Sequence, residues 1–369
     1  RAHLPQGTKF LGVMKADAYG HGAVPVSRAL ADLGAEYLAV SNLEEAVQIR
    51  RGEVRLPILI LGYTPAEYAS NMIFLDITQE VHSLEYAREL NEALAGTNYI
   101  LNVHLKLDTG MTRIGFFAYD NERTLDELRQ VAQLPHLHIE GVFMHFCVAD
   151  SRAEADVSFT KLQYKRFMDM LSAMAGVGIR PEIRHCCNSG ATILYPEFAL
   201  DMVRPGIITY GNAPSDELAG ALRLRPMMSL HSMIAQVRTV PAGTDISYGR
   251  LYRTKEETRV AVLPIGYADG LSRLLTGKAS FYLQGHQVPV IGRICMDMCM
   301  IDVSGVPEAK PGDVVTIFGY DDDGTLLPCE RLARAQGTIN YELLCQISKR
   351  IPRICHRGAE TSQILQYIV

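Results

Sequence analysis

The chain has 369 residues, 48% of them hydrophobic and 21% charged, a balance typical of a soluble globular protein and not of a disordered one. Its formal net charge of -5 arises from 36 basic and 41 acidic residues, so nucleic acid and anionic membranes are not expected partners. No apolar stretch reaches the roughly 18 residues that span a bilayer, so we expect no membrane contact by this segment. A chain of this length predicts two domains.

Near the N-terminus, residues 10–14 read FLGVM and resemble a fully buried strand of a parallel sheet, and Lys15 follows directly. Desolvation of a lysine at such a strand end lowers its pKa, which favours an amine that forms a Schiff base or takes up a proton. Alternatively, Lys15 lies at a strand edge and extends into water. Gly20 and Gly22 allow a tight turn close to a ligand, and Tyr19 adds a hydrogen-bonding group.

Short apolar segments then alternate with amphipathic segments, which predicts repeated βα units and a parallel sheet. Helices are expected near residues 24–33 and 83–95. The eight predicted strands are 10–15, 36–41, 56–62, 72–78, 102–110, 137–146, 182–190 and 202–207. We therefore predict an α/β fold in which residues 1–212 form a (β/α)8 TIM-like barrel.

From residue 213 to residue 369 the predicted strands are short and alternating, and turn sequences such as PAG, PGD and DDDG separate them. This pattern predicts a mostly antiparallel β domain, with one short helix near residues 330–336.

Polar side chains gather at the predicted C-terminal ends of the barrel strands, the edge where active sites of this fold are built. Those residues are Lys15, Arg113, His145, His185, Asn188, Ser189 and Arg204. Asn188 and Ser189, with Gly206 and Ile207 one strand later, offer donors where the last two βα loops meet, which favours a phosphate site. An ordinary NSG turn is the alternative.

The run KADAYGHG at residues 15–22 resembles the cofactor-lysine signature of bacterial alanine racemases, the fold type III enzymes that carry pyridoxal 5'-phosphate on a barrel. Further matches follow in the order of that family: HF at 145–146, MVRPGI at 202–207, SYG at 247–249, PIGYADG at 264–270, GRICMDMCM at 292–300 and TINYE at 338–342. Together they cover nearly the whole chain.

The resemblance implies a role for each matching residue. Lys15 and Tyr248 would be the two catalytic bases, with Tyr248 supplied by the second subunit of a homodimer that shares its active sites. An ordinary tyrosine has a pKa near 10, so such a role requires roughly 4 kcal/mol of selective stabilisation of the phenolate. The implied cofactor-binding residues are Lys15, Tyr19, Arg113, His145, Asn188, Ser189, Arg204, Gly206, Ile207 and Tyr341. Arg113, Tyr267 and Met296 would contact the substrate.

Two further residues would act behind these: Lys106, which is often carbamylated in the family and braces Arg113, and His185, which orients Arg204. Arg204 itself would face the pyridine nitrogen of the cofactor. Because arginine does not give up its proton, that nitrogen stays largely unprotonated and the cofactor is a weak electron sink. Side reactions such as transamination are then suppressed.

We therefore predict an isomerase, a pyridoxal-phosphate-dependent racemase of L- and D-alanine with a two-base mechanism. One alternative is a serine racemase, or serine/alanine racemase, of the membrane-anchored vancomycin-resistance type, because an apolar pocket separates such substrates by only about a hundredfold. A non-catalytic pyridoxal-phosphate carrier is the other alternative, although such carriers lack the β domain.

We expect no metal, because the cysteines form no second ligand cluster at zinc-site spacing. The eight cysteines are expected as reduced thiols, which indicates a cytoplasmic protein or the cytoplasmic part of a longer membrane-anchored chain.

Overall fold

The computed structural model describes residues 4–119, 121–358 and 360–367, and the chain divides into two compact units. The barrel unit comprises the chain up to Ala18 together with Ala23–Arg225. The C-terminal unit comprises the short segment Tyr19–Gly22 and the chain from Pro226 onward. Among the described residues, no helix combines the length and the apolar character needed to cross a membrane.

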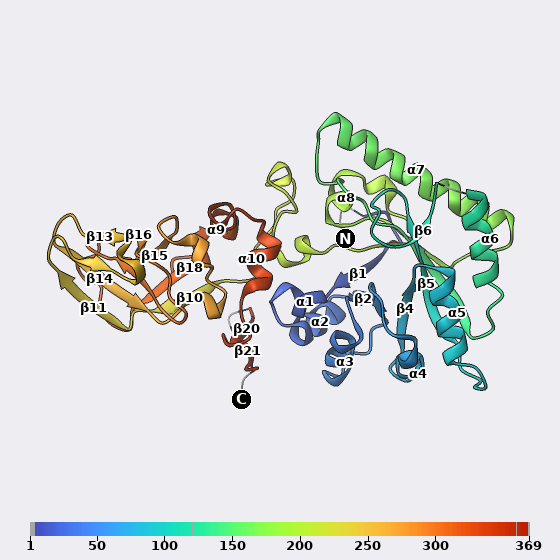
Figure 1. Cartoon of the computed structure of the whole chain (residues 1–369), viewed down its shortest axis with the longest axis horizontal. Coiled ribbons are helices and arrows are strands. Elements are labelled where there is room, and N and C mark those ends of the chain that lie inside the picture. The colour runs from blue at the N-terminus through green and yellow to red at the C-terminus, as the bar shows by residue number, and fades with distance from the viewer. Residues whose placement is uncertain (1–3, 120, 359, 368–369) are drawn as a thin grey trace. The chain divides into compact units, whose positions relative to one another are not determined.

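Parallel strands form the wall of the barrel unit, in the order β8-β7-β5-β4-β3-β2-β1-β9, and a short strand β6 pairs with β5 (Figure 1). Backbone hydrogen bonds from Asp201 N to Arg184 O (3.1 Å) and from Arg204 N to Cys187 O (2.9 Å) link the segments at β8 and β9, so the barrel is nearly closed. The prediction of a TIM-like barrel is confirmed. The strands are β1 Lys9–Val13, β2 Tyr37–Val40, β3 Ile58–Ile60, β4 Ile77–Val81, β5 Leu101–Asp108, β6 Phe116–Phe117, β7 Leu137–Phe143, β8 Ile183–His185 and β9 Met202–Val203.

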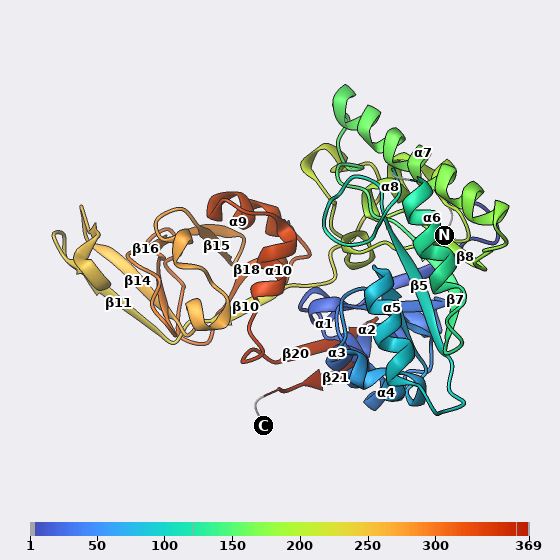
Figure 2. The same cartoon turned by 45° about the vertical axis from the view of Figure 1, so that its right-hand side comes forward.

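Helices surround these strands in both views of the barrel unit (Figures 1 and 2). Strands such as β2 (YLAV) and β3 (ILI) are buried along their whole length, as expected where helices cover the outer face and side chains fill the interior. Asn42 begins one helix by accepting a hydrogen bond from Glu45 N at 3.0 Å. The helices are α2 Ala23–Asp32, α3 Leu43–Arg51, α4 Ala69–Phe74, α5 Leu84–Ala93, α6 Asn121–Val131, α7 Glu154–Gly176 and α8 Ser189–Leu194.

The predicted strand at 72–78 is wrong in its first half, because residues up to Phe74 belong to α4 and β4 begins at Ile77. Asp76 between them has a φ of 52°, and Arg50 donates to the carbonyls of Leu75 (2.7 Å) and Asp76 (2.7 Å). This side chain therefore stabilises a tight turn that the apolar pattern does not reveal.

Two later predicted strands are shorter than expected. The strand expected at 182–190 ends at His185, and α8 begins at Ser189. The strand expected at 202–207 ends at Val203 because Pro205 has no N–H for the sheet, and a 3-10 helix η3 spans Ile207–Tyr210.

The C-terminal unit contains an antiparallel sheet in the order β10-β18-β15-β16-β17-β14-β11, with β19 paired to β18, which confirms the predicted β domain. Fully buried Phe281, Ile301 and Ile317 lie in its core. The predicted helix at 330–336 is present as α9, whereas α10 was not expected. The strands are β10 Leu230–Met233, β11 Gln236–Val240, β12 Asp245–Ile246, β13 Tyr252–Arg253, β14 Thr258–Leu263, β15 Ser280–Leu283, β16 His286–Ile291, β17 Cys299–Asp302, β18 Val314–Tyr320, β19 Leu326–Leu327, β20 Arg353–Arg357 and β21 Glu360–Leu365. The helices are α9 Cys329–Gln336 and α10 Asn340–Gln346.

Candidate active site

Lys15 begins a left-handed turn at the C-terminal edge of the barrel. This turn, α1 (Lys15–Tyr19), follows β1 and holds Ala16, Asp17 and Ala18 at φ values of 53°, 55° and 56°. For L-residues the left-handed helical region costs about 1–2 kcal/mol per residue. Strain of this kind is found where the surrounding structure fixes a functional group.

Two carboxylates hold the turn. Glu45 accepts hydrogen bonds from Ala16 N at 2.7 Å and from Ser41 N at 2.7 Å, and Asp17 accepts one from Ala23 N at 2.8 Å. These contacts offset part of the strain and fix the backbone that carries Lys15. Lys15 is exposed in the single chain. The expectation that burial at the end of the strand removes water from its amine is therefore wrong for the single chain.

Arg204 is a buried cation one residue beyond β9. Its Nη1 donates to His185 Nδ1 at 2.8 Å, and its Nη2 donates to Met144 O at 2.7 Å and Cys186 O at 3.2 Å. Among the described residues, Nε has no acceptor. Burial lowers the pKa of Arg204 to about 10, so the guanidinium remains charged at neutral pH. The predicted contact between His185 and Arg204 is therefore present.

His145 follows β7, and its Nδ1 lies 3.5 Å from Arg204 Nη2. Burial, and after it the positive charges of Arg204 and Lys106, lower the pKa of His145 well below its ordinary value. The imidazole is consequently neutral, which suits a ring that lies against an aromatic cofactor.

Lys106 lies inside the barrel on β5, where only 4% of it is exposed. Its Nζ donates to Leu107 O at 2.9 Å and lies 5.4 Å from the centre of the Phe143 ring. Burial, with the charge of Arg204 next in importance, lowers the pKa of Lys106 to about 7. A large fraction of this amine is therefore neutral and nucleophilic at physiological pH. Arg113, in the loop after β5, is exposed.

The predicted phosphate-binding residues come together at the starts of α8 and η3. Asn188 caps α8 by accepting from Ala191 N at 2.9 Å, and Ser189 Oγ accepts from Gly206 N at 2.9 Å. The first N–H groups of any helix have no acceptor within that helix. Here α8 begins at Ser189 and η3 begins at Ile207, so the first N–H groups of both helices belong to this part of the barrel edge. This set of neutral donors suits an anion.

Tyr19 and Tyr341 lie together in the C-terminal unit, with ring centroids 6.0 Å apart. Burial raises the pKa of Tyr19, so its hydroxyl keeps its proton. Arg353 Nε donates to Gly20 O at 3.0 Å, and a Cβ on Gly20 would lie 2.4 Å from Leu344 O. The glycine thus permits the segment Tyr19–Gly22 to pack against α10, which carries Tyr341.

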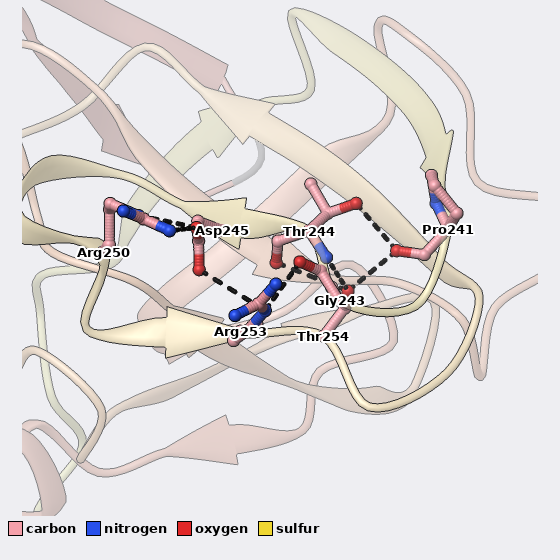
Figure 3. A network of polar contacts seen from close by, with 7 residues as sticks. All are labelled: Pro241, Gly243, Thr244, Asp245, Arg250, Arg253 and Thr254. Carbon is pink, nitrogen blue, oxygen red and sulfur yellow. Dashed lines mark hydrogen bonds and ion pairs between the residues drawn. The ribbon is translucent and has the colours of Figure 1, made fainter.

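Tyr248 stands at the tip of the β12–β13 hairpin, on a short 3-10 turn η5 (Tyr248–Arg250), and is 70% exposed. Figure 3 shows the polar contacts that hold this hairpin: Arg250 Nε donates to Asp245 at 2.6 Å, and Thr254 Oγ1 accepts from Thr244 N at 2.9 Å. Ser247, just before the tyrosine, has a φ of 65°. The hairpin therefore presents Tyr248 outward on a well-braced turn.

The segment 293–296 connects the remaining predicted residues. Ser247 Oγ donates to Arg293 O at 2.7 Å, and Tyr267 N donates to Cys295 O at 3.0 Å. Met296 is the last residue of this segment. Its carbonyl oxygen lies so close to Gly266, the residue before Tyr267, that a Cβ on Gly266 would be only 2.3 Å away from it. The structure thus brings Tyr267 and Met296 side by side, both partly exposed. Among the described residues, no group of three or more His, Cys, Asp or Glu side chains could hold a metal ion.

Two polar residues in the barrel interior were not predicted. His104 contacts His185, with 2.8 Å between Nδ1 and Nε2, and Glu140 contacts His104 at 3.0 Å. The sequence did carry a signal for the first: His104, Lys106 and Asp108 alternate with apolar residues along β5 and so share one face.

Comparisons with known proteins agree with this geometry. Residues 1–214 match the family model "Alanine racemase, N-terminal domain", and residues 227–355 match "Alanine racemase, C-terminal domain". The chain belongs to the alanine racemase family.

Individual relatives extend over the whole chain. The alanine racemase of Desulfovibrio desulfuricans is 46% identical over 351 residues, which cover 95% of this chain and 92% of the relative. The solved structure of the alanine racemase of Clostridium difficile 630 has a TM-score of 0.93 at 39% identity, and the match covers 100% of this chain and 94% of the Clostridium chain. The Bacillus anthracis enzyme with bound L-Ala-P has a TM-score of 0.91 at 35% identity, with 99% and 93% covered.

Membership of the alanine racemase family confirms the predicted enzyme class, an isomerase of the racemase type. These relatives are all named alanine racemases, so the comparisons favour neither the serine racemase nor the non-catalytic carrier.

Proposed function

We propose that this chain interconverts L- and D-alanine with pyridoxal 5'-phosphate held on Lys15. The observation that carries the proposal is the buried guanidinium of Arg204, which His185 and two carbonyls fix beside His145 while Nε has no acceptor in the described parts of the chain. A fixed donor of this kind fits an unprotonated pyridine nitrogen. The hydroxyl of Ser189, which accepts from Gly206 N and still has its own proton to donate, fits a phosphate.

The residues that would hold the cofactor follow from this arrangement and from the family resemblance. Lys15 would bind the aldehyde carbon, Arg204 the pyridine nitrogen and His145 a ring face. The phosphate would be held by Asn188, Ser189, Gly206 and Ile207, and Tyr19 and Tyr341 are assigned to the cofactor by the family resemblance alone. When bound, pyridoxal phosphate withdraws electrons from the bond between Cα and its hydrogen, which makes that hydrogen acidic.

The chain supplies the proton transfers. Nζ of Lys15 would exchange the Cα proton on one face of the substrate, and Oη of Tyr248 would exchange it on the opposite face, which inverts the centre. Arg113 would orient the substrate carboxylate, while Tyr267 and Met296 would line the entrance. Lys106 would be carbamylated through its neutral amine and would then brace Arg113. In this proposal residues 1–212 bind the cofactor and residues 213–369 supply the second base.

Reduction with borohydride tests the cofactor assignment. The purified enzyme should carry a yellow chromophore, and peptide mass spectrometry after reduction should locate a pyridoxyl group on Lys15. A protein without the chromophore, or with the label elsewhere, would contradict it. Alanine in deuterated solvent should gain deuterium at Cα as it racemises, whereas a carrier would exchange nothing.

We also propose a homodimer in which Tyr248 serves the partner's site. Mixing the Lys15→Ala and Tyr248→Phe variants under exchange conditions tests this directly, because a mixed dimer then contains one site with both bases. Activity should recover to about a quarter of the parent value when the two inactive proteins exchange subunits freely. If both bases come from one chain, mixing restores nothing.

We place the enzyme in the cytoplasm, where the thiols of its eight cysteines would stay reduced.

A further inference from the structure

A continuous chain of hydrogen bonds runs through the barrel interior from Arg204 to Glu140. Arg204 Nη1 lies 2.8 Å from His185 Nδ1, His185 Nε2 lies 2.8 Å from His104 Nδ1, and His104 Nε2 lies 3.0 Å from Glu140 Oε2. His104 and His185 are fully buried. We call these four residues the polar column.

The polar column permits only one arrangement of protons. Arg204 can only donate, so His185 Nδ1 must accept and its proton must lie on Nε2. His104 Nδ1 then accepts the hydrogen bond from His185 Nε2–H. The proton of the His104 ring therefore lies on Nε2 and is donated to Glu140. Burial is the largest cause that lowers the pKa of both histidines, and His185 is lowered further by the charge of Arg204. Both rings are therefore neutral.

Glu140 is built as the accepting end of this column. Tyr37 OH donates to Oε1 at 2.9 Å and Thr78 Oγ1 donates to Oε2 at 3.3 Å, in addition to His104. Burial raises the pKa of Glu140, but the hydrogen bonds from His104, Tyr37 and Thr78 outweigh it and leave the pKa lowered. Three protein donors therefore hold this carboxylate in its ionised form.

A β-bulge directs this half-buried carboxylate toward His104. In the pairing of β5 with β7, Val103 lies opposite Ile139 but His104 lies opposite Gly141, so Glu140 is the extra residue. Gly141 leaves room for the imidazole, because a Cβ there would lie 2.5 Å from the ring of His104. The backbone is thus shaped for the contact between His104 and Glu140.

Among the described residues, no carboxylate forms an ion pair with Arg204. The polar column instead connects the guanidinium of Arg204 to the carboxylate of Glu140 through hydrogen bonds. We propose that Glu140 is a positioning residue, which through His104 and His185 keeps the His185 Nδ1 lone pair aimed at Arg204 and so holds the guanidinium against the cofactor nitrogen. This inference rests on the proposed function.

Loss of the acceptor at position 140 has a specific chemical consequence. His104 Nε2–H would lose its partner inside the barrel, and a change of tautomer in His104 would oppose the donor of His185 and then that of Arg204. A displaced Arg204 would let water protonate the pyridine nitrogen and would strengthen the electron sink. More turnovers would then end in transamination, in which water hydrolyses the C=N bond, the carbon skeleton of alanine leaves as pyruvate and its amino group stays on the cofactor.

The first test uses the unmodified protein without cofactor. Nitrogen NMR of ¹⁵N-histidine protein should show His104 and His185 as neutral Nε2–H tautomers from pH 6 to pH 8. An imidazolium or an Nδ1–H tautomer at either position would overturn the proposal, whatever the activity. This readout is independent of the proposed function, whose own failure would be an enzyme that neither binds pyridoxal phosphate nor racemises alanine.

The second test compares three variants of the holoenzyme. Glu140→Met is nearly isosteric but lacks an acceptor, and it should raise the ratio of transamination to racemisation at least tenfold. Glu140→Gln keeps an oxygen for His104 and should restore the parent ratio. Tyr37→Phe removes one donor to Glu140 without interrupting the polar column, so it should lower the melting temperature and leave the ratio unchanged. The ratio does not depend on the fraction of folded enzyme.

A folded Glu140→Met enzyme with the parent ratio, or a Tyr37→Phe enzyme with an equally raised ratio, would refute the positioning role. If Glu140→Met does not fold, the tautomers of the unmodified protein still decide, because an imidazolium or an Nδ1–H tautomer at His104 or His185 overturns the proposal.

Discussion

The buried amine of Lys106 makes a prediction that pH and denaturant can test. Its pKa falls from an ordinary 10.5 to about 7 in the folded chain. Each unit of difference in pKa corresponds to about 1.4 kcal/mol, so at pH 7 the buried lysine lowers the free energy of unfolding by about 4 kcal/mol. Lys106→Met keeps the packing against Phe143 and removes this cost, although the loss of the bond to Leu107 O offsets about 1 kcal/mol.

The sign follows from the protons bound. Between pH 7 and pH 10.5 the unfolded lysine holds its proton and the folded one does not, so the stability of the parent rises with pH by up to about 1.4 kcal/mol per unit. The advantage of Lys106→Met should therefore shrink as pH rises, from about 3 kcal/mol at pH 7 to about 1 kcal/mol at pH 9. Urea unfolding of cofactor-free, carbon dioxide-depleted protein at pH 7, 8 and 9 measures the difference.

Lys161 is the matched control, because it is exposed on α7. Lys161→Met should leave the pH dependence of the parent unchanged. Parallel pH profiles for the parent and Lys106→Met would show that the amine is not desolvated as described. If Lys106 is carbamylated, added bicarbonate should stabilise the parent and leave Lys106→Met unaffected.

Three further changes probe the left-handed turn, the proposed phosphate site and the proposed second base. Ala16→Gly relieves a left-handed residue at φ 53°, and chemical denaturation should show a gain of up to about 1 kcal/mol after the larger chain entropy of glycine is subtracted. Gly190→Ala would place a Cβ 2.8 Å from Ala149 O, so it should cost about 1–3 kcal/mol and weaken binding of pyridoxal phosphate measured by titration. Gly176→Ala, with no atom within 4 Å of the new Cβ, is its control and should be neutral or slightly stabilising. Tyr248→Phe should keep the chromophore and the fold but lower the rate of racemisation at least about a hundredfold. Racemisation of both L- and D-alanine at the parent rate would contradict the role of Tyr248 as the second base.

Much of the barrel could be predicted because strands such as β2 and β3 are apolar throughout and helices such as α3 begin at capping residues such as Asn42. The strand predicted at 72–78 failed because a short apolar run is compatible with a helix or a strand, and the Arg50 hydrogen bonds that decide between them come from another element. The left-handed turn at Ala16 was equally hidden, since alanine has no preference for that conformation.

Some residues of the candidate site could likewise be predicted from the sequence, and others could not. Residues that end strands, such as Lys15 and Arg204, could be predicted because strand ends meet at one edge of a barrel. Glu140 could not, because its inward direction depends on a bulge in pairing with β5, and nothing in the sequence around it marks that irregularity. Long-range register, and not local pattern, places it next to His104.

The four residues Tyr19–Gly22 follow the turn that Lys15 begins, but they belong to the C-terminal unit, where Arg353 and Leu344 hold them. A single crossover near Pro226 would therefore not exchange complete modules between homologous enzymes. Chimeras that carry the donor's Tyr19–Gly22 along with its C-terminal half should assemble better than those that leave the segment behind, because shuffling at one breakpoint pairs this tetrapeptide with a foreign α10.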